Sequence, residues 1–206
     1  MPSYWERKAQ ILRKPLADRK KGLGRPNGEI RLASLIEESI VDGPGLRFVL
    51  FTQGCPHRCP GCHNPQTHLP IGGTLISVEE ILAIYDKHPA CRGITLSGGE
   101  PFMHAGSLAK VAAAVHRRGG DVVTYTGYRL GQLTNLAKTD DGTLALLSET
   151  DLLIDGPFVL EMRCLEQPFV GSSNQRLIAL SLAGNRLLDD IPILPEGPTI
   201  GRISYE

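Results

Sequence analysis

The chain has 206 residues, 41% of them hydrophobic and 21% charged, which suits a single well-buried domain over residues 31–206. No apolar run approaches the roughly 20 residues that span a bilayer, and the N-terminus lacks the apolar core of a signal peptide, so we expect a cytoplasmic protein with no membrane partner. The net charge is zero, but residues 1–31 hold nine Lys or Arg against three acidic residues, so we expect residues 1–30 to be a flexible basic extension rather than an arm for nucleic acid.

After this extension, runs typical of strands alternate with amphipathic helical patterns. A strand is predicted over residues 46–51, and Ser77 with Glu80 forms a capping box that begins the first helix. The patterns that follow predict, in chain order, a strand at 93–96, a helix around 108–115, a strand at 121–125, a helix at 130–136, a helical piece at 144–147 and a strand at 152–154. Residues 176–182 fit either a helix or a strand, and three prolines predict an irregular C-terminal segment, at positions Pro192, Pro195 and Pro198.

This alternation predicts an α/β fold with βαβ units and a parallel sheet. A complete eight-unit barrel needs about 250 residues, and only about 175 follow the extension. We therefore expect an open sheet or a partial (β/α) barrel of about five or six units. Ligands bind at the carboxyl edge of such sheets, where the loops after residues 51 and 96 are expected to meet.

Three of the five cysteines lie within eight residues, in a C-x3-C-x2-C pattern formed by Cys55, Cys59 and Cys62. Thiolates select zinc, copper(I) or iron–sulfur clusters. A structural zinc site needs four ligands, and His57 or His63 would have to supply the fourth. A 4Fe–4S cluster has four irons to ligate, so three thiolates would leave one iron open to a substrate. The pattern favours a cluster, with a non-catalytic zinc-binding module as the alternative.

The remaining cysteines, Cys91 and Cys164, stand alone in the sequence. Each is expected to be a small buried hydrophobic residue rather than a ligand. Their isolation also fits a reducing compartment, where disulfides are rare.

Two motifs carry a family resemblance. C-x3-C-x2-C directly after a strand resembles the signature of the radical S-adenosylmethionine (SAM) superfamily, and Ser97-Gly98-Gly99-Glu100 resembles its glycine-rich motif. The resemblance implies a radical SAM partial barrel with one 4Fe–4S cluster on the three cysteines. It further implies that SAM chelates the open iron and is cleaved to methionine and a 5′-deoxyadenosyl radical, and that the catalytic and cofactor-binding residues are Cys55, Cys59, Cys62, Gly61, His63, Gly98, Gly99 and Glu100.

The finer resemblance covers nearly all of residues 30–180. Residues 39–47 and Cys62-His63-Asn64 look like the activases of glycyl radical enzymes, and residues 125–128, 155–158 and 171–176 are similar to activating proteins of anaerobic (class III) ribonucleotide reductases. This implies a protein substrate, a reductase whose C-terminal glycine becomes a glycyl radical. It also implies an electron donor such as flavodoxin or ferredoxin, and leaves a homodimer open.

Four further residues have expected roles. Thr126 and Asp155 follow later strands, so they are candidates for binding the SAM ribose or the partner glycine, or else a turn residue and a cap. Asn174 and Arg176 either bind the partner or satisfy local backbone groups.

Other functions stay open. His63 matches the pyruvate formate-lyase activases, whereas the ribonucleotide reductase activases often have an aromatic residue there. A short radical SAM enzyme with a small-molecule substrate, as in deazapurine synthesis, would need the same motifs. Gly61 also departs from the aromatic residue that many radical SAM proteins carry before the last cysteine, a departure in which the ribonucleotide reductase activases resemble this chain.

Overall fold

The computed structural model describes residues 28–164, 166–194 and 197–202. The basic extension predicted for residues 1–30 therefore lies outside the described residues, except at its end. There, strand β1 begins at Glu29, two residues before the predicted start of the domain.

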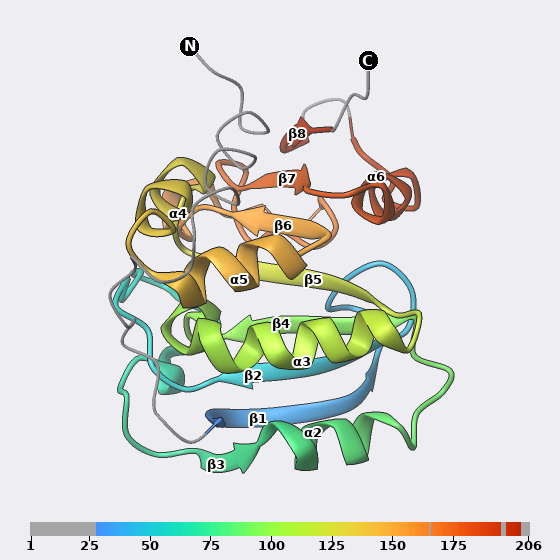
Figure 1. Cartoon of the computed structure of the whole chain (residues 1–206). Coiled ribbons are helices and arrows are strands. Elements are labelled where there is room, and N and C mark those ends of the chain that lie inside the picture. Colours follow the sequence, from blue (N-terminus) through green and yellow to red (C-terminus); the bar gives the residue numbers. More distant parts are fainter. Residues whose placement is uncertain (1–27, 165, 195–196, 203–206) are drawn as a thin grey trace.

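One mixed sheet of eight strands runs through the molecule in the order β3-β1-β2-β4-β5-β6-β7-β8 (Figure 1). The central strands β2, β4, β5 and β6 are parallel, whereas β1 is antiparallel to β2 and β3, and β7 is antiparallel to β6. The mixed α/β class is thus confirmed, and the parallel arrangement holds for the centre of the sheet. The strands are β1 (Glu29–Ser39), β2 (Arg47–Thr52), β3 (Thr74–Ser77), β4 (Gly93–Gly98), β5 (Asp121–Thr126), β6 (Leu152–Asp155), β7 (Arg176–Ala179) and β8 (Thr199–Gly201).

The described residues form five α-helices and three short 3-10 helices. They are α2 (Val78–Tyr85), α3 (Ala105–Arg117), α4 (Leu130–Leu136), α5 (Asp141–Glu149), α6 (Leu182–Asp189), η2 (Pro65–Thr67), η3 (Pro101–His104) and η4 (Leu160–Met162). The predicted capping box begins α2, since Ser77 Oγ accepts from the Glu80 N–H at 3.2 Å and Glu80 Oε2 accepts from the Ser77 N–H at 2.9 Å. Within the described ranges, none of the helices has the length and apolar character needed to cross a membrane.

Side-chain alternation along the strands divides the core between the two faces of the sheet. Phe48 and Leu50 of β2 are fully buried in the larger cluster. Helices α2 and α3, which lie over the same face of the sheet (Figure 1), contribute to this cluster. On β6, Leu153 belongs to that cluster, while its neighbours Leu152 and Ile154 lie in a second cluster with two leucines of α6. Helix α6 therefore covers the β6–β7 end of the other face, and the site occupies the part of that face nearer β2.

The amino ends of the parallel strands are joined by a buried arginine. Arg47 has no exposed surface; it pairs with Asp121 and donates to Thr95 Oγ1 at 3.1 Å and to the Ile94 carbonyl at 2.5 Å. These contacts connect β2, β4 and β5 at the edge opposite the cysteine loop.

Several elements were not predicted from the sequence. Strand β1 was missed because its second half is mostly exposed and reads as a charged segment without alternation. Residues 176–182 hold strand β7 and then the first residue of α6, so one ambiguous stretch contains both elements. Strand β8 lies in the segment predicted to be irregular, and it pairs with β7 in parallel.

Candidate iron–sulfur site

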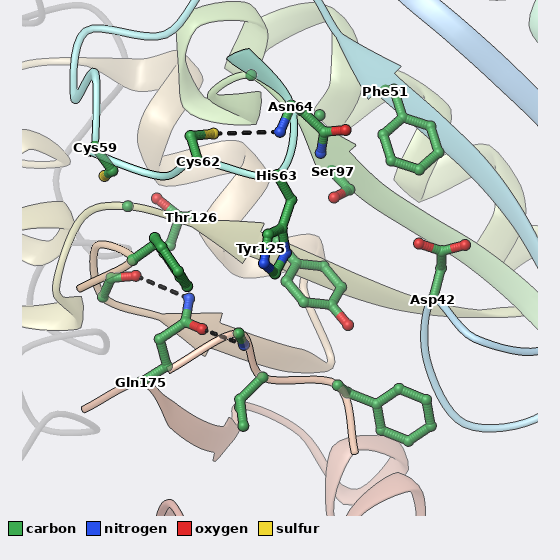
Figure 2. Close-up of a pocket in the computed structure, with 18 of the residues that line it drawn as sticks. Asp42, Phe51, Cys59, Cys62, His63, Asn64, Ser97, Tyr125, Thr126 and Gln175 are labelled. Carbon is green, nitrogen blue, oxygen red and sulfur yellow. Dashed lines mark hydrogen bonds between the residues drawn. The ribbon is translucent and has the colours of Figure 1, made fainter. Parts of the chain in front are cut away.

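A pocket of about 790 Å³ lies over the carboxyl ends of the parallel strands. Its strand-borne wall is a row of side chains from Phe51 of β2, Ser97 of β4 and Tyr125 of β5 (Figure 2). Phe51 and Ser97 are direct partners in the β2–β4 register. Burial raises the pKa of the Tyr125 hydroxyl well above its ordinary value, so this wall is uncharged at neutral pH.

The three cysteines of the predicted site all line this pocket, on the loop that leaves β2. A backbone hydrogen bond from the Gly54 N–H to the Thr67 carbonyl at 2.8 Å closes the loop, and one from the Cys62 N–H to the Cys59 carbonyl at 3.2 Å forms a turn within it. Two of the thiols are shown in Figure 2, where Cys62 Sγ accepts from the Asn64 N–H at 3.4 Å.

The other two sulfurs also face backbone N–H groups. Burial raises the pKa of the Cys55 thiol, against the lowering effect of the N–H groups of His57 and Arg58. Burial likewise raises the pKa of the Cys59 thiol, against the N–H of Phe158. The neighbouring thiols raise these pKa values further, because three closely spaced thiolates repel one another. A cation that neutralises this charge would convert the set to thiolates.

The glycine-rich motif at the end of β4 lies directly against the start of the cysteine loop. The Gly99 N–H donates to the Thr52 carbonyl at 2.8 Å, and the Glu100 N–H donates to the Gly54 carbonyl at 2.8 Å. A Cβ on Gly98 or Gly99 would overlap the backbone of residues 51–54, and Gly98 has a φ of +96°. Only glycine fits at these two positions, because the two backbone segments are in direct contact. Both glycines also line the pocket.

Glu100 lies beneath the pocket rather than on its lining. Its side chain has no exposed surface. Its carboxylate accepts hydrogen bonds from Thr126 Oγ1 at 2.9 Å, the Gly127 N–H at 2.9 Å, the Phe102 N–H at 3.0 Å and His57 Nε2 at 2.8 Å. Of the two candidates in this cluster, Thr126 reaches the pocket and Glu100 supports it from behind.

Asp155 is also fully buried and is absent from the lining. Its carboxylate accepts from Arg176 Nε at 2.8 Å and from the Leu130 N–H at 2.6 Å, at the start of α4. Asp155 therefore caps a helix and pairs with Arg176. This placement fits a structural role as a cap, the second of the two roles expected for it.

The segment over residues 171–175 holds the loop that follows Asp155. Asn174 Nδ2 donates to the Pro157 carbonyl at 2.9 Å. Gln175 Nε2 donates to the Gly156 carbonyl at 3.1 Å (Figure 2). Asn174 thus satisfies a local backbone group. The loop that it holds carries Phe158, whose N–H faces the Cys59 sulfur and whose ring centroid lies 5.0 Å from that of His63.

Gly61 and His63 flank the last cysteine in different ways. His63 lines the pocket, whereas Gly61 lies outside the lining and faces Leu160 of η4. Gly61 has a φ of +70°, a conformation that favours glycine.

Sequence reasoning missed several pocket residues, among them Cys164, Ile40 and Val41. Cys164 was expected to be buried; it is instead half-buried and lines the pocket, whereas Cys91 is buried as expected. Ile40 and Val41 also line the pocket and are 76% and 73% exposed. Their loop is part of the stretch that carries the family resemblance, but no periodicity marks its side chains as pocket residues.

The donor set fits a cluster ligated by thiolates. Three thiols open into one pocket, each sulfur faces at least one backbone N–H, and such hydrogen bonds to sulfur are typical of iron–sulfur sites. Among the described residues, no three Cys, His, Asp or Glu side chains converge at the distances that hold a single metal ion.

The 4Fe-4S single cluster domain family matches residues 41–178. The fold and the three-thiol pocket therefore belong to a protein with a single 4Fe–4S cluster domain.

Curated relatives narrow the class. The anaerobic ribonucleoside-triphosphate reductase-activating protein of Vibrio cholerae serotype O1 is 37% identical over 145 residues, covering 66% of this chain and 89% of the relative. Its counterpart in Escherichia coli (strain K12) is 34% identical, covering 66% and 90%. The pyruvate formate-lyase-activating enzyme of Clostridium pasteurianum is 32% identical over 129 residues, covering 59% and 53%. The chain belongs to the family of radical SAM activating proteins of glycyl radical enzymes, in the branch of the anaerobic ribonucleoside-triphosphate reductase-activating proteins.

Proposed function

We propose that this protein activates an anaerobic ribonucleoside-triphosphate reductase by generating a glycyl radical on it. The observation that carries the proposal is the placement of Cys55, Cys59 and Cys62 in one pocket, beside the Gly98–Gly99 backbone at the adjacent strand end. The identity of 37% and 34% to the relatives from Vibrio cholerae and Escherichia coli, over about nine tenths of each, supports the choice of reaction. The fold is accordingly proposed to be a partial barrel of the radical SAM type.

Cys55, Cys59 and Cys62 would hold a 4Fe–4S cluster. Such a cluster, once bound and reduced, would supply the single electron needed for the cleavage of SAM to methionine and a 5′-deoxyadenosyl radical. Gly98 and Gly99 would present backbone to the methionyl part of SAM, since neither has a side chain to block it. His63 and Thr126, which line the pocket, are proposed as further contacts. The uncharged wall of Phe51 and Tyr125 would shield the radical from water.

The pocket of about 790 Å³ is open to solvent at Ile40 and Val41. A glycine-bearing segment of the reductase would enter there, and the hydrogen atom would move from its Cα to the 5′ carbon of the nucleoside. Flavodoxin or ferredoxin is proposed as the electron donor, and a homodimer as the assembly.

The test is an anaerobic reconstitution with iron and sulfide, followed by reduction and addition of SAM. We expect 5′-deoxyadenosine, and a glycyl radical signal in electron paramagnetic resonance (EPR) when the anaerobic reductase is present. Cys59→Ala should lose both products, whereas Cys91→Ala, at a buried cysteine outside the pocket, should keep them. Colourless protein with stoichiometric zinc would overturn the proposal.

The same assay separates the second candidate, an activase of pyruvate formate-lyase, which the relative from Clostridium pasteurianum favours. A glycyl radical on pyruvate formate-lyase, with none on the reductase, would establish that alternative. SAM cleavage without a radical on either protein would point to a small-molecule substrate.

A further inference from the structure

His57 lies inside the cysteine loop, two residues after Cys55 and two before Cys59. Its side chain is only 17% exposed, although the residue sits on a loop. His57 lines the same pocket as the three thiols, and its Nε2 lies 2.8 Å from Glu100 Oε2.

The imidazole occupies a site built by the three residues Thr126, Gly127 and Tyr128 at the end of β5, and closed by Glu100. We call these four residues the His57 socket. The Tyr128 ring meets the imidazole edge-on, with centroids 4.5 Å apart and an interplanar angle of 75°. Gly127 forms the floor, and a Cβ there would overlap three atoms of the imidazole.

Hydrogen bonds hold the socket together, since two of its residues donate directly to Glu100 and Tyr128 is joined to them through Thr126. Thr126 Oγ1 and the Gly127 N–H donate to the carboxylate, and Thr126 Oγ1 in turn accepts from the Tyr128 N–H at 3.1 Å. The Phe102 N–H donates to the same carboxylate from η3. A fully buried carboxylate with four donors is held strongly in place, since losing any donor leaves buried charge unsatisfied.

The backbone of His57 also lies beside the Cys55 sulfur. The N–H groups of His57 and Arg58 are the ones that face the Cys55 sulfur. Arg58 has a φ of +46°, which side chains rarely adopt, so the turn between Cys55 and Cys59 is tight. Such a turn persists only where surrounding contacts hold it.

We propose that His57 is the positioning residue of the cysteine loop: its imidazole, seated in the His57 socket, fixes Cys55 and Cys59 in their places before a cluster binds. This assigns the Thr126-Gly127-Tyr128 stretch a role in aligning thiols with the Gly98–Gly99 backbone. The inference rests on the proposed function only for the identity of the group that the thiols hold.

The first measurement uses the apoprotein and needs neither iron nor SAM. Amide hydrogen exchange of the peptide over residues 55–62 should be about tenfold faster in His57→Ala, because the loop opens locally. Gly127→Ala should give the same increase by displacing the ring, although the histidine is retained. Gly131→Ala is the matched control, since a Cβ there meets nothing within 4 Å, and it should leave exchange unchanged. His57→Gln keeps a donor in place of Nε2 and should restore exchange to within about threefold of the parent protein.

The second measurement uses the reconstituted proteins. In His57→Ala and Gly127→Ala we expect altered g values of the reduced cluster and a shifted midpoint potential, whereas Gly131→Ala should match the parent protein. Unchanged exchange and an unchanged EPR spectrum in both His57→Ala and Gly127→Ala would overturn the proposal. Faster exchange over the whole chain, with an equal loss of global stability, would also overturn it. A parent protein that never cleaves SAM would refute the proposed function and leave the exchange result to decide this one.

Discussion

The side chain of Leu160 lies against Gly61 in the cysteine loop, such that a Cβ on Gly61 would sit 2.8 Å from Leu160 Cδ1. Leu160 follows the loop whose Phe158 N–H faces the Cys59 sulfur. The position before the last cysteine is therefore filled from another part of the chain. This contact gives a physical reason for glycine where many radical SAM proteins carry an aromatic residue.

Replacing Gly61 with alanine should destabilise the apoprotein more than the same change at Gly72. Both glycines have positive φ, which costs alanine about 1 kcal/mol, but only Gly61 has a neighbour in the way. We expect an excess of about 1 kcal/mol at Gly61 from overpacking, measured by urea unfolding. Adding Leu160→Ala to Gly61→Ala should remove that excess. Equal costs at the two positions would show that Leu160 moves aside freely.

Breaking the Asp155–Arg176 pair should destabilise the fold strongly. Arg176→Met leaves the buried Asp155 carboxylate without its main partner, at a cost of about 3 kcal/mol. The double variant Asp155→Asn with Arg176→Met should recover part of this loss, because it removes the uncompensated charge. Urea unfolding of the apoproteins measures both, and additive losses in the double variant would contradict the prediction.

The stability of the protein should depend on pH through His116. A hydrogen bond from its Nε2 to Asp151 at 2.9 Å, with a second from Nδ1 to Glu149 at 2.8 Å, raises the pKa of His116 to about 9. Because the pKa of His116 is higher in the folded state, protonation of His116 stabilises the folded protein. This contribution is fully present below the unfolded-state pKa of about 6.5 and is lost as pH rises through about 9. Compared with His116→Gln, the parent protein should be more stable at pH 6, and the difference should vanish by about pH 10. A difference independent of pH would contradict this.

The thiols of the apoprotein should react slowly at neutral pH. Burial raises the pKa values of Cys55 and Cys59 above the ordinary thiol value, so few thiolates exist at pH 7. Alkylation by iodoacetamide, followed by peptide mass spectrometry, should accelerate with pH up to and beyond about 9. Loading a cluster should release protons and protect all three cysteines. Fast alkylation of Cys55 at pH 7 would contradict the assigned burial.

Local sequence signals predicted the elements around the site well. The strands predicted to begin at residues 46, 93, 121 and 152 correspond to β2, β4, β5 and β6. The predicted capping box at Ser77 begins α2. Glycine and proline mark where these strands end. Because parallel strands bring their carboxyl ends to one edge, chain order alone placed the cysteine loop beside the glycine-rich motif.

What the sequence by itself determined is therefore the chemistry: three thiols on one loop, two glycines on the next strand end, and a family with a known reaction. The tertiary structure decided where the side chains of the charged candidates lie. Glu100 and Asp155 follow strands in the same way as the pocket residues, yet both are fully buried and hold other parts of the chain, His57 and Arg176. Spacing along a strand fixes which edge a residue reaches. Whether its carboxylate points into the pocket depends on which donors distant segments supply, and local sequence does not encode those contacts.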